Sequence, residues 1–309
     1  MDEQTFLDAV RGKARRTKQW VAPKLTYTAD SFSDAYTILR NDQLGFIGLI
    51  ILGFFVFVAI FAEPLAPYDP MQRNLEARLE PPSMAHPLGT TVVGRDVLSQ
   101  LIFGTRTTLL VGLAAGLTSV TLGTTIGIVT GYLGGYVDDV LMRLTDLAYG
   151  IPFLPFALAL VFILGASLVN IIVAISLIMW RSTARVVRAQ TLTVKEQPYI
   201  ESAEAAGVGH LRMMARHVLP NVFPIVVLYT ALTMGWSILA EANLAFLGFG
   251  DPLRVSWGTM IFGTYSQDVI RTALWWVIPP GICIMLIVMA VFFIGRALEE
   301  YINPELKEA

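Results

Sequence analysis

The sequence has little charge and almost no cysteine. Only 15% of its 309 residues are charged, whereas 55% are hydrophobic, and the mean hydropathy is +0.61. A soluble domain needs more polar surface than this, so the composition excludes an ordinary soluble protein and indicates an integral membrane protein. The single cysteine, Cys283, excludes an intrachain disulfide and a cysteine-based metal cluster.

Motifs for catalysis and for nucleotide binding are also missing. The only Gly-Lys pair, Gly12-Lys13, is followed by Ala14, so the phosphate-binding pattern G-x-x-x-x-G-K-[ST] does not occur. The three histidines are far apart in the sequence and form no metal-ligand array. We find no nucleophile elbow and no basic, aromatic-rich surface for nucleic acid. We therefore expect no enzyme activity, no metal, no cofactor bound by this chain and no nucleic-acid partner.

Six apolar runs in the sequence suit membrane helices. Crossing a hydrocarbon core of ~30 Å takes about 20 helical residues. The runs predict an all-α membrane protein, with spans at about residues 44–62, 108–132, 147–164, 168–187, 223–246 and 273–294. The polar segment 65–106, rich in proline and glycine, is expected to fold outside the bilayer. An even number of spans places both termini on one side.

The second apolar run repeats glycine at four-residue spacing. Small residues at this spacing lie on one helix face and allow another helix backbone to approach closely. We therefore expect tight helix packing along this face, with a direct role in substrate passage as the alternative. The glycines are Gly112, Gly116, Gly123, Gly127 and Gly131.

Charge assigns the two sides of the membrane. The predicted spans place 16 of the 22 lysines and arginines on the side of the N-terminus and six on the other side. Because lysine and arginine favour the cytoplasmic side, residues 1–43 are expected to be a cytoplasmic tail, and residues 303–309 a second one. Residues 32–39 suit either a helix on the membrane surface or a disordered tail with anchoring aromatic residues.

Residues 189–221 form a polar interruption that is much longer than a chain needs to re-enter the bilayer. Helix-favouring residues at 201–206 precede Gly207, and Pro220 stands before the next apolar run. This order predicts a short helix, a turn and a second short helix. We expect a cytoplasmic docking surface for a partner, with a merely amphipathic surface helix as the alternative.

Glu241 is the one clear ionisable residue inside a predicted span. It lies about 27 Å from the start of that span at 1.5 Å per residue, and therefore near the outer boundary of the bilayer. We expect Glu241, with the nearby Asn243, to have a structural role or to line an outer gate. A proton relay at the midplane is the weaker alternative.

Several motifs resemble those of a known family. The stretch Glu201-Ser-Ala-Glu-Ala-Ala-Gly207, followed after nine residues by His217-Val-Leu219-Pro220, resembles the EAA loop of ABC-importer permeases. Segments spread over residues 44–302 are similar, in order, to the dipeptide/oligopeptide/nickel permease family and to its DppC/OppC-type subunit. They include Pro67-Tyr68-Asp69-Pro70, His86-Pro-Leu-Gly-Thr90, Gly94-Arg95-Asp96, Glu241-Ala-Asn243 and Ser256-Trp257-Gly258.

Two segments depart from the family pattern. Glu204 stands where many peptide permeases have arginine, which puts the choice of ATPase partner in question. Asp251-Pro-Leu-Arg-Val replaces the usual proline-rich run before Ser256, on the surface where a binding protein would dock. Neither departure changes the family to which the sequence is similar.

The resemblance implies a type I ABC-importer permease (MetI-like) bundle with a cytoplasmic EAA coupling helix, located in a prokaryotic cytoplasmic (inner) membrane. It implies half of a translocation path for di- or oligopeptides, completed by a second, related permease subunit of the DppB/OppB type. An extracytoplasmic substrate-binding protein would deliver the substrate, and two ABC ATPase subunits would use ATP and Mg. The residues expected to dock on the ATPases are Glu201, Ala203, Glu204, Ala205, Ala206, Gly207, Leu219 and Pro220.

An ion-coupled secondary transporter acting without ATPase subunits is the main alternative function. Such a protein calls for ionisable groups or broken helices near the midplane, often in two repeated halves. The sequence shows no such pair, and its polar residues are concentrated in the loop 189–221 instead. A structural membrane anchor is a third alternative, but it would not account for the long external segment.

Overall fold

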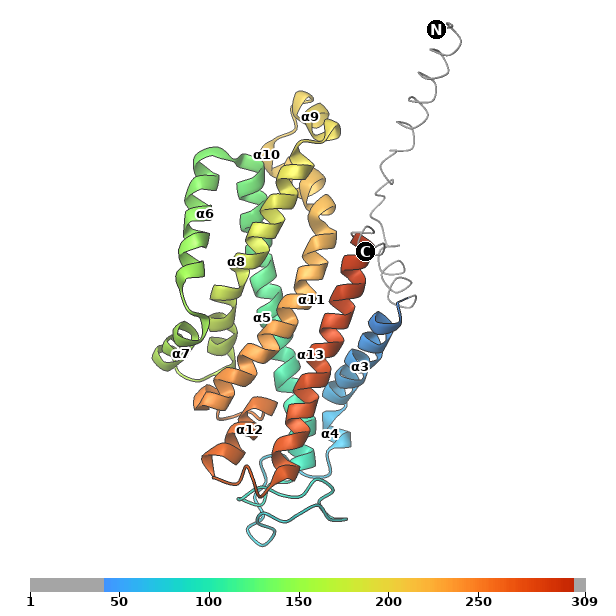
Figure 1. Ribbon diagram of the computed structural model, residues 1–309, viewed down its shortest axis with the longest axis vertical. Helices are drawn as coiled ribbons and strands as arrows, with labels where there is room; N and C mark the ends of the chain where they lie inside the picture. The colour runs from blue at the N-terminus through green and yellow to red at the C-terminus, as the bar shows by residue number, and fades with distance from the viewer. Residues whose placement is uncertain (1–41, 303–309) are drawn as a thin grey trace, which may run out of the picture. The chain divides into compact units, whose positions relative to one another are not determined.

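The computed structural model describes residues 42–302, and these form a bundle of helices (Figure 1). Five helices are long and apolar enough to cross a membrane, and a bent pair makes a sixth span if it is counted as one. The prediction of an all-helical membrane protein is confirmed. The predicted tails 1–41 and 303–309, with the surface helix suggested for 32–39, lie outside the described residues. The long helices are α3 (Gln43–Ile60), α5 (Val97–Leu133), α8 (Leu168–Lys195), α11 (Leu219–Leu244) and α13 (Leu274–Ile302).

Helix α5 lies at the centre of the bundle and packs against both α8 and α11. A Cβ atom added to Gly127 would lie 2.7 Å from a backbone oxygen of α8. A Cβ atom added to Gly112 would lie 2.5 Å from the Ile238 side chain of α11. No real Cβ atom tolerates such distances, so the glycine face of α5 is needed for close packing, as predicted.

Helix α5 begins at Val97, and not near residue 108 as predicted. Asp96 caps its first turn by accepting a hydrogen bond from the Ser99 backbone N–H at 2.7 Å. Arg106, which the prediction placed in the external segment, lies inside the helix and donates to backbone carbonyls at the end of α3. The boundary was wrong because polar residues that make contacts between helices were interpreted as loop residues.

The predicted third span, 147–164, is part of a bent pair of helices. Helix α6 (Gly135–Gly150) contains the acidic residues Asp138, Asp139 and Asp146, and α7 (Phe153–Leu164) follows it at an angle of 91°. Pro152 explains the bend, because proline disfavours helical dihedrals in the residue before it, and Ile151 is extended. Two ion pairs connect α6 to α8: Arg188 with Asp138 and Arg185 with Asp146, each at 2.5 Å.

The loop 189–221 is mostly helical. It contains the end of α8, then α9 (Pro198–Ala205), a turn through Gly207, and α10 (His210–Met213). The π-helix η1 (Met214–Val218) joins α10 to α11, so residues 210–249 form one helical span of 40 residues. The predicted second short helix is therefore the start of the next span. Pro220 lies near the start of α11 but inside this continuous span, and the wider π turn before it accommodates the proline ring and its missing N–H.

The segment between the fifth and sixth predicted spans contains an additional helix, α12 (Trp257–Ser266), which follows the short π-helix η2 (Ala245–Phe249). A capping box between Ser256 and Thr259 starts α12, and this Ser-x-x-Thr pattern was the sequence signal for it. Trp257 is fully buried, and its indole N–H donates to a backbone carbonyl of α5 at 3.0 Å. Residues 66–96 are called here the outer cap. The outer cap and the small helix α4 (Ala62–Leu65) before it lie at the same end of the bundle as α12.

Candidate coupling site

Helix α9 has an apolar underside that holds it against the bundle. Ile200 is fully buried, and it belongs to one apolar cluster with Met213 and Val218 from the following helices. Tyr132, at the end of α5, belongs to the same cluster. Burying one such aliphatic side chain contributes about 1.5–3 kcal/mol. The position of α9 is therefore fixed relative to α5 and α11, and a force on α9 reaches both helices.

The opposite side of α9 is exposed and consists of small residues around one acid. Gly207 has φ +79, a conformation that favours glycine, and a Cβ atom placed on it would meet no atom within 4 Å. Nothing in the described chain covers this side. Tyr199, which precedes the exposed group, is itself 43% exposed, and the burial of part of its side chain raises the pKa of its phenol. Glu204 is exposed as well but hydrogen-bonds to the bundle, and the other exposed residues, called here the coupling surface, are Glu201, Ser202, Ala205, Ala206 and Gly207.

The remaining predicted residues of the EAA loop support this surface. Ala203 is half-buried and packs on the apolar cluster under α9. Leu219 packs on the same cluster, and Pro220 beside it is half-buried at the start of α11. The structure thus divides the predicted set into an exposed group on α9 and its turn and a supporting group beneath it.

Glu204 makes a contact that the sequence did not predict. The Tyr132 hydroxyl donates to Glu204 Oε1 at 3.0 Å and lies 3.3 Å from His210 Nδ1. The Lys195 ammonium donates to the Tyr132 carbonyl oxygen at 2.8 Å. This network joins four helices around the base of α9. Sequence reasoning missed Tyr132, Lys195 and His210, because residues 72 and 78 positions apart carry no local signal of contact.

The two predicted gate residues do not lie together. Glu241 is 2% exposed, receives a hydrogen bond from the Ser256 side chain, and leaves Oε2 without a hydrogen-bond partner. Asn243, two residues later, is exposed. Glu241 thus binds the first residue of the α12 capping box. This contact favours the structural alternative for Glu241 over a gate-lining role.

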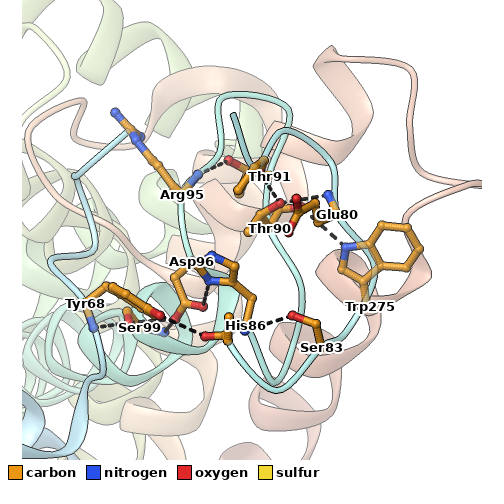
Figure 2. Close-up of polar contacts among 12 residues, drawn as sticks. Tyr68, Glu80, Ser83, His86, Thr90, Thr91, Arg95, Asp96, Ser99 and Trp275 are labelled. Carbon is orange, nitrogen blue, oxygen red and sulfur yellow. Dashed lines mark hydrogen bonds and ion pairs between the residues drawn. The ribbon is translucent and has the colours of Figure 1, made fainter. Parts of the chain in front are cut away.

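The outer cap is held by a buried polar network (Figure 2). His86 Nδ1 lies 2.9 Å from Asp96 Oδ1, and Asp96 Oδ2 accepts hydrogen bonds from the backbone and hydroxyl of Ser99 at 2.7 Å. The Tyr68 ring lies 5.0 Å from the His86 ring, and its hydroxyl donates to the Ala85 carbonyl at 3.0 Å. The motif residues of this segment therefore hold the cap onto the start of α5.

An apolar groove of about 830 Å³ lies between α5, α11 and α13 and reaches η1. Its walls are mostly aliphatic, with a few threonine hydroxyls. Among the described residues, no group of histidine, cysteine, aspartate and glutamate side chains could hold a metal ion. Residues that line the groove include Leu117, Thr121, Thr124, Met214, Val226 and Met234.

Residues 123–308 match the family described as "Binding-protein-dependent transport system inner membrane component". Residues 31–82 match the family described as "N-terminal TM domain of oligopeptide transport permease C". Over 279 residues, the chain is 38% identical to the "Dipeptide transport system permease protein DppC" of Escherichia coli (strain K12). The aligned region covers 87% of this chain and 91% of that protein.

Two further relatives have other peptide substrates in their names. The chain is 36% identical over 270 residues to the "Di/tripeptide transport system permease protein DppC" of Pseudomonas aeruginosa (strain UCBPP-PA14), covering 85% of this chain and 88% of that protein. It is also 36% identical over 271 residues to the "Glutathione transport system permease protein GsiD" of Pectobacterium atrosepticum, covering 87% and 89%.

These matches cover most of the chain and extend over both the coupling surface and the outer cap. The family consists of multi-pass membrane transport components and not of ATPases, and its systems include ATPase and binding-protein partners. This dependence on partners contradicts the alternative of an ion-coupled transporter that acts alone. The chain therefore belongs to the family of binding-protein-dependent transport system inner membrane components.

Proposed function

We propose that this chain is one of two different permease subunits in a prokaryotic ABC importer for small peptides, and that its coupling surface receives the ATPase subunits. The observation that carries the proposal is the two-sided build of α9. Its underside is fully buried at Ile200, while Glu201, Ala205, Ala206 and Gly207 are exposed. One side of α9 is packed on the bundle and the other side is exposed, so a partner bound to the exposed side could move the whole bundle.

The chemistry of the coupling surface suits a groove on a protein partner. Alanine and glycine allow close backbone approach, and Glu201 offers a carboxylate to a basic residue of the ATPase. Movement of the ATPases would pass through Ile200 and the Tyr132 network into α5 and α11. The bundle would then alternate between an inward-facing and an outward-facing state.

The other partners follow from the surfaces that remain. The apolar groove between α5, α11 and α13 suits a second permease subunit of the DppB/OppB type, so that the path lies between the two chains. An extracytoplasmic binding protein would dock at the end that carries the outer cap. Both termini would be cytoplasmic, and ATP and Mg would be used by the two ATPase subunits, with no cofactor bound by this chain.

The peptide substrate is proposed from the relatives, whose names give dipeptides, tripeptides and glutathione. At the outer end, we propose that Glu241 controls opening indirectly, because it binds the N-cap residue of α12. Asn243, which is exposed on the same helix, is the better candidate for a residue that faces the path.

Reconstitution tests the proposal. The chain should co-purify with two ATPase subunits and a second permease, and proteoliposomes holding this complex should accumulate a dipeptide only when ATP and the loaded binding protein are both supplied. An ATPase-free preparation is the control. Peptide accumulation driven by an ion gradient without ATP, or a stable complex that lacks ATPase subunits, would refute the proposal.

A further inference from the structure

A cavity of about 380 Å³ lies at the end of the molecule that carries the outer cap. Its walls come from the cap, from the starts of α5 and α13, and from the segment that runs from η2 through α12. The volume falls within the range of about 300–1,000 Å³ that is common for small-molecule sites. The cavity is separate from the coupling surface, which lies at the other end of the bundle.

Three arginines line this cavity: Arg73 and Arg95 from the outer cap, and Arg254 from the distant segment before α12. Asp251 is the only acidic residue among the described lining residues. Its carboxylate already accepts hydrogen bonds from the backbone N–H groups of Leu168, at 3.0 Å, and Leu253, at 2.9 Å. Asp251 also lies 4.0 Å from Arg254. The cavity therefore carries a positive charge that the described chain does not neutralise.

The side chains of Arg73 and Arg95 have neither an acidic partner nor a hydrogen bond within residues 42–302. Arg95 Nε is buried and unpartnered, and Figure 2 shows this side chain extending away from the polar network of the cap. Burial, and then the charge of Arg73, lower the pKa of Arg95. Arg73 is exposed and solvent screens part of its charge, so an anionic ligand would chiefly neutralise the half-buried charge of Arg95.

The remaining walls add one more unpaired donor and an apolar surface. Trp276 is 6% exposed, lines the cavity, and has an indole N–H without a hydrogen-bond partner. Met260 and Phe262 provide apolar surface beside it. A ligand that fits both parts has an anionic group next to a hydrocarbon group.

We infer that this cavity binds the C-terminal residue of a peptide, with the α-carboxylate on Arg73 and Arg95 and the side chain against Met260 and Phe262. Guanidinium groups bind carboxylates in a planar, two-point geometry. The same positive charge disfavours a free amino terminus, so the peptide enters with its carboxyl end first. This inference rests on the proposed function and adds a site to it.

Saturation-transfer NMR on the assembled complex, without binding protein or ATP, tests the site directly. The probes are alanylphenylalanine and its C-terminal amide, which differ only in the anionic group. We expect the acid to bind about tenfold more tightly than the amide, as for one charge-assisted contact. The preference should disappear in Arg95→Gln and in Arg73→Gln, because these substitutions remove the donors and no described contact of the fold.

Arg271→Gln is the matched control, because Arg271 is exposed and does not line the cavity. Equal binding of acid and amide by the parental complex, or a preference that survives in both cavity variants, overturns the inference. The uptake assay separates this result from the proposed function. If the complex binds the acid more tightly but imports no peptide, the site is supported and the proposed peptide import is wrong. If the complex imports peptide but binds acid and amide equally, the proposed import is supported and the site is wrong.

Discussion

Gly207 is the residue at which the shape of the coupling surface is most narrowly defined. Its φ of +79 is left-handed, so most other residues add backbone strain of roughly 1–2 kcal/mol, and asparagine and aspartate add less. The space around it is empty in the described chain, so a side chain added there would meet only the partner. The glycine therefore serves both the turn after α9 and the approach of another protein.

We predict that Gly207→Asp lowers peptide uptake by about tenfold or more. The new carboxylate would be buried without a partner at the interface with the ATPase, which costs several kcal/mol of binding free energy. Uptake and ATP hydrolysis by reconstituted complexes measure this loss. Gly207→Asn is the matched control, since asparagine has nearly the same size and tolerates the left-handed conformation. If the aspartate variant took up peptide at the parental rate, Gly207 would not lie at the interface with the ATPase.

Tyr132 is the residue that connects α9 to the centre of the bundle by a hydrogen bond. We predict that Tyr132→Phe leaves assembly intact but lowers the number of peptides imported per ATP hydrolysed. The lost hydroxyl contact is worth about 0.5–1.5 kcal/mol. Glu204→Gln keeps an acceptor for the same hydroxyl and should behave like the parental chain. A normal ratio in Tyr132→Phe would show that the contact only stabilises the loop.

Whole elements could be predicted from the sequence where their signal is local. The first span was placed to within a few residues, because the apolar run 44–62 has charged or proline-containing ends. The start of α5 and the whole of α12 were missed, because Arg106 and Trp257 make contacts with residues distant in sequence. The π turn η1 was also missed, since Pro220 by itself indicates a helix start. Periodicity reports which residues are apolar, but it does not report which helix a polar residue will touch.

The capping box of α12 gives a prediction for an element. Ser256→Ala removes the N-cap, worth about 0.5–2 kcal/mol, and also the donor that binds Glu241. We expect a lower melting temperature of the complex in detergent, read from the loss of intact complex on gel filtration after heating. Ser256→Thr keeps the hydroxyl and should melt close to the parental protein. An unchanged melting temperature in the alanine variant would mean that tertiary contacts of Trp257 alone hold α12.

At the scale of the molecule, the two segments with motif residues are far apart. The EAA loop and the motif residues of the outer cap were both selected from their residues, and the structure places them at opposite ends of the bundle. The arginine cavity could not be predicted in this way. Arg73 and Arg95 come from the outer cap and Arg254 comes from the segment before α12, and only the packing of the cap onto α12 brings them to one cavity.

Topology gives the last prediction, since the charge count and the proposed docking both require α9 to be cytoplasmic and the outer cap to be external. We expect Met84→Cys, at a fully exposed position of the cap (101%), to react with a membrane-impermeant maleimide in intact cells. Ser202→Cys, exposed on the coupling surface, should react only after permeabilisation. Both are made in a Cys283→Ala background, which is itself the unlabelled control. The reverse labelling pattern would show that the protein has the opposite orientation in the membrane, so that α9 could not contact ATPases in the cytoplasm.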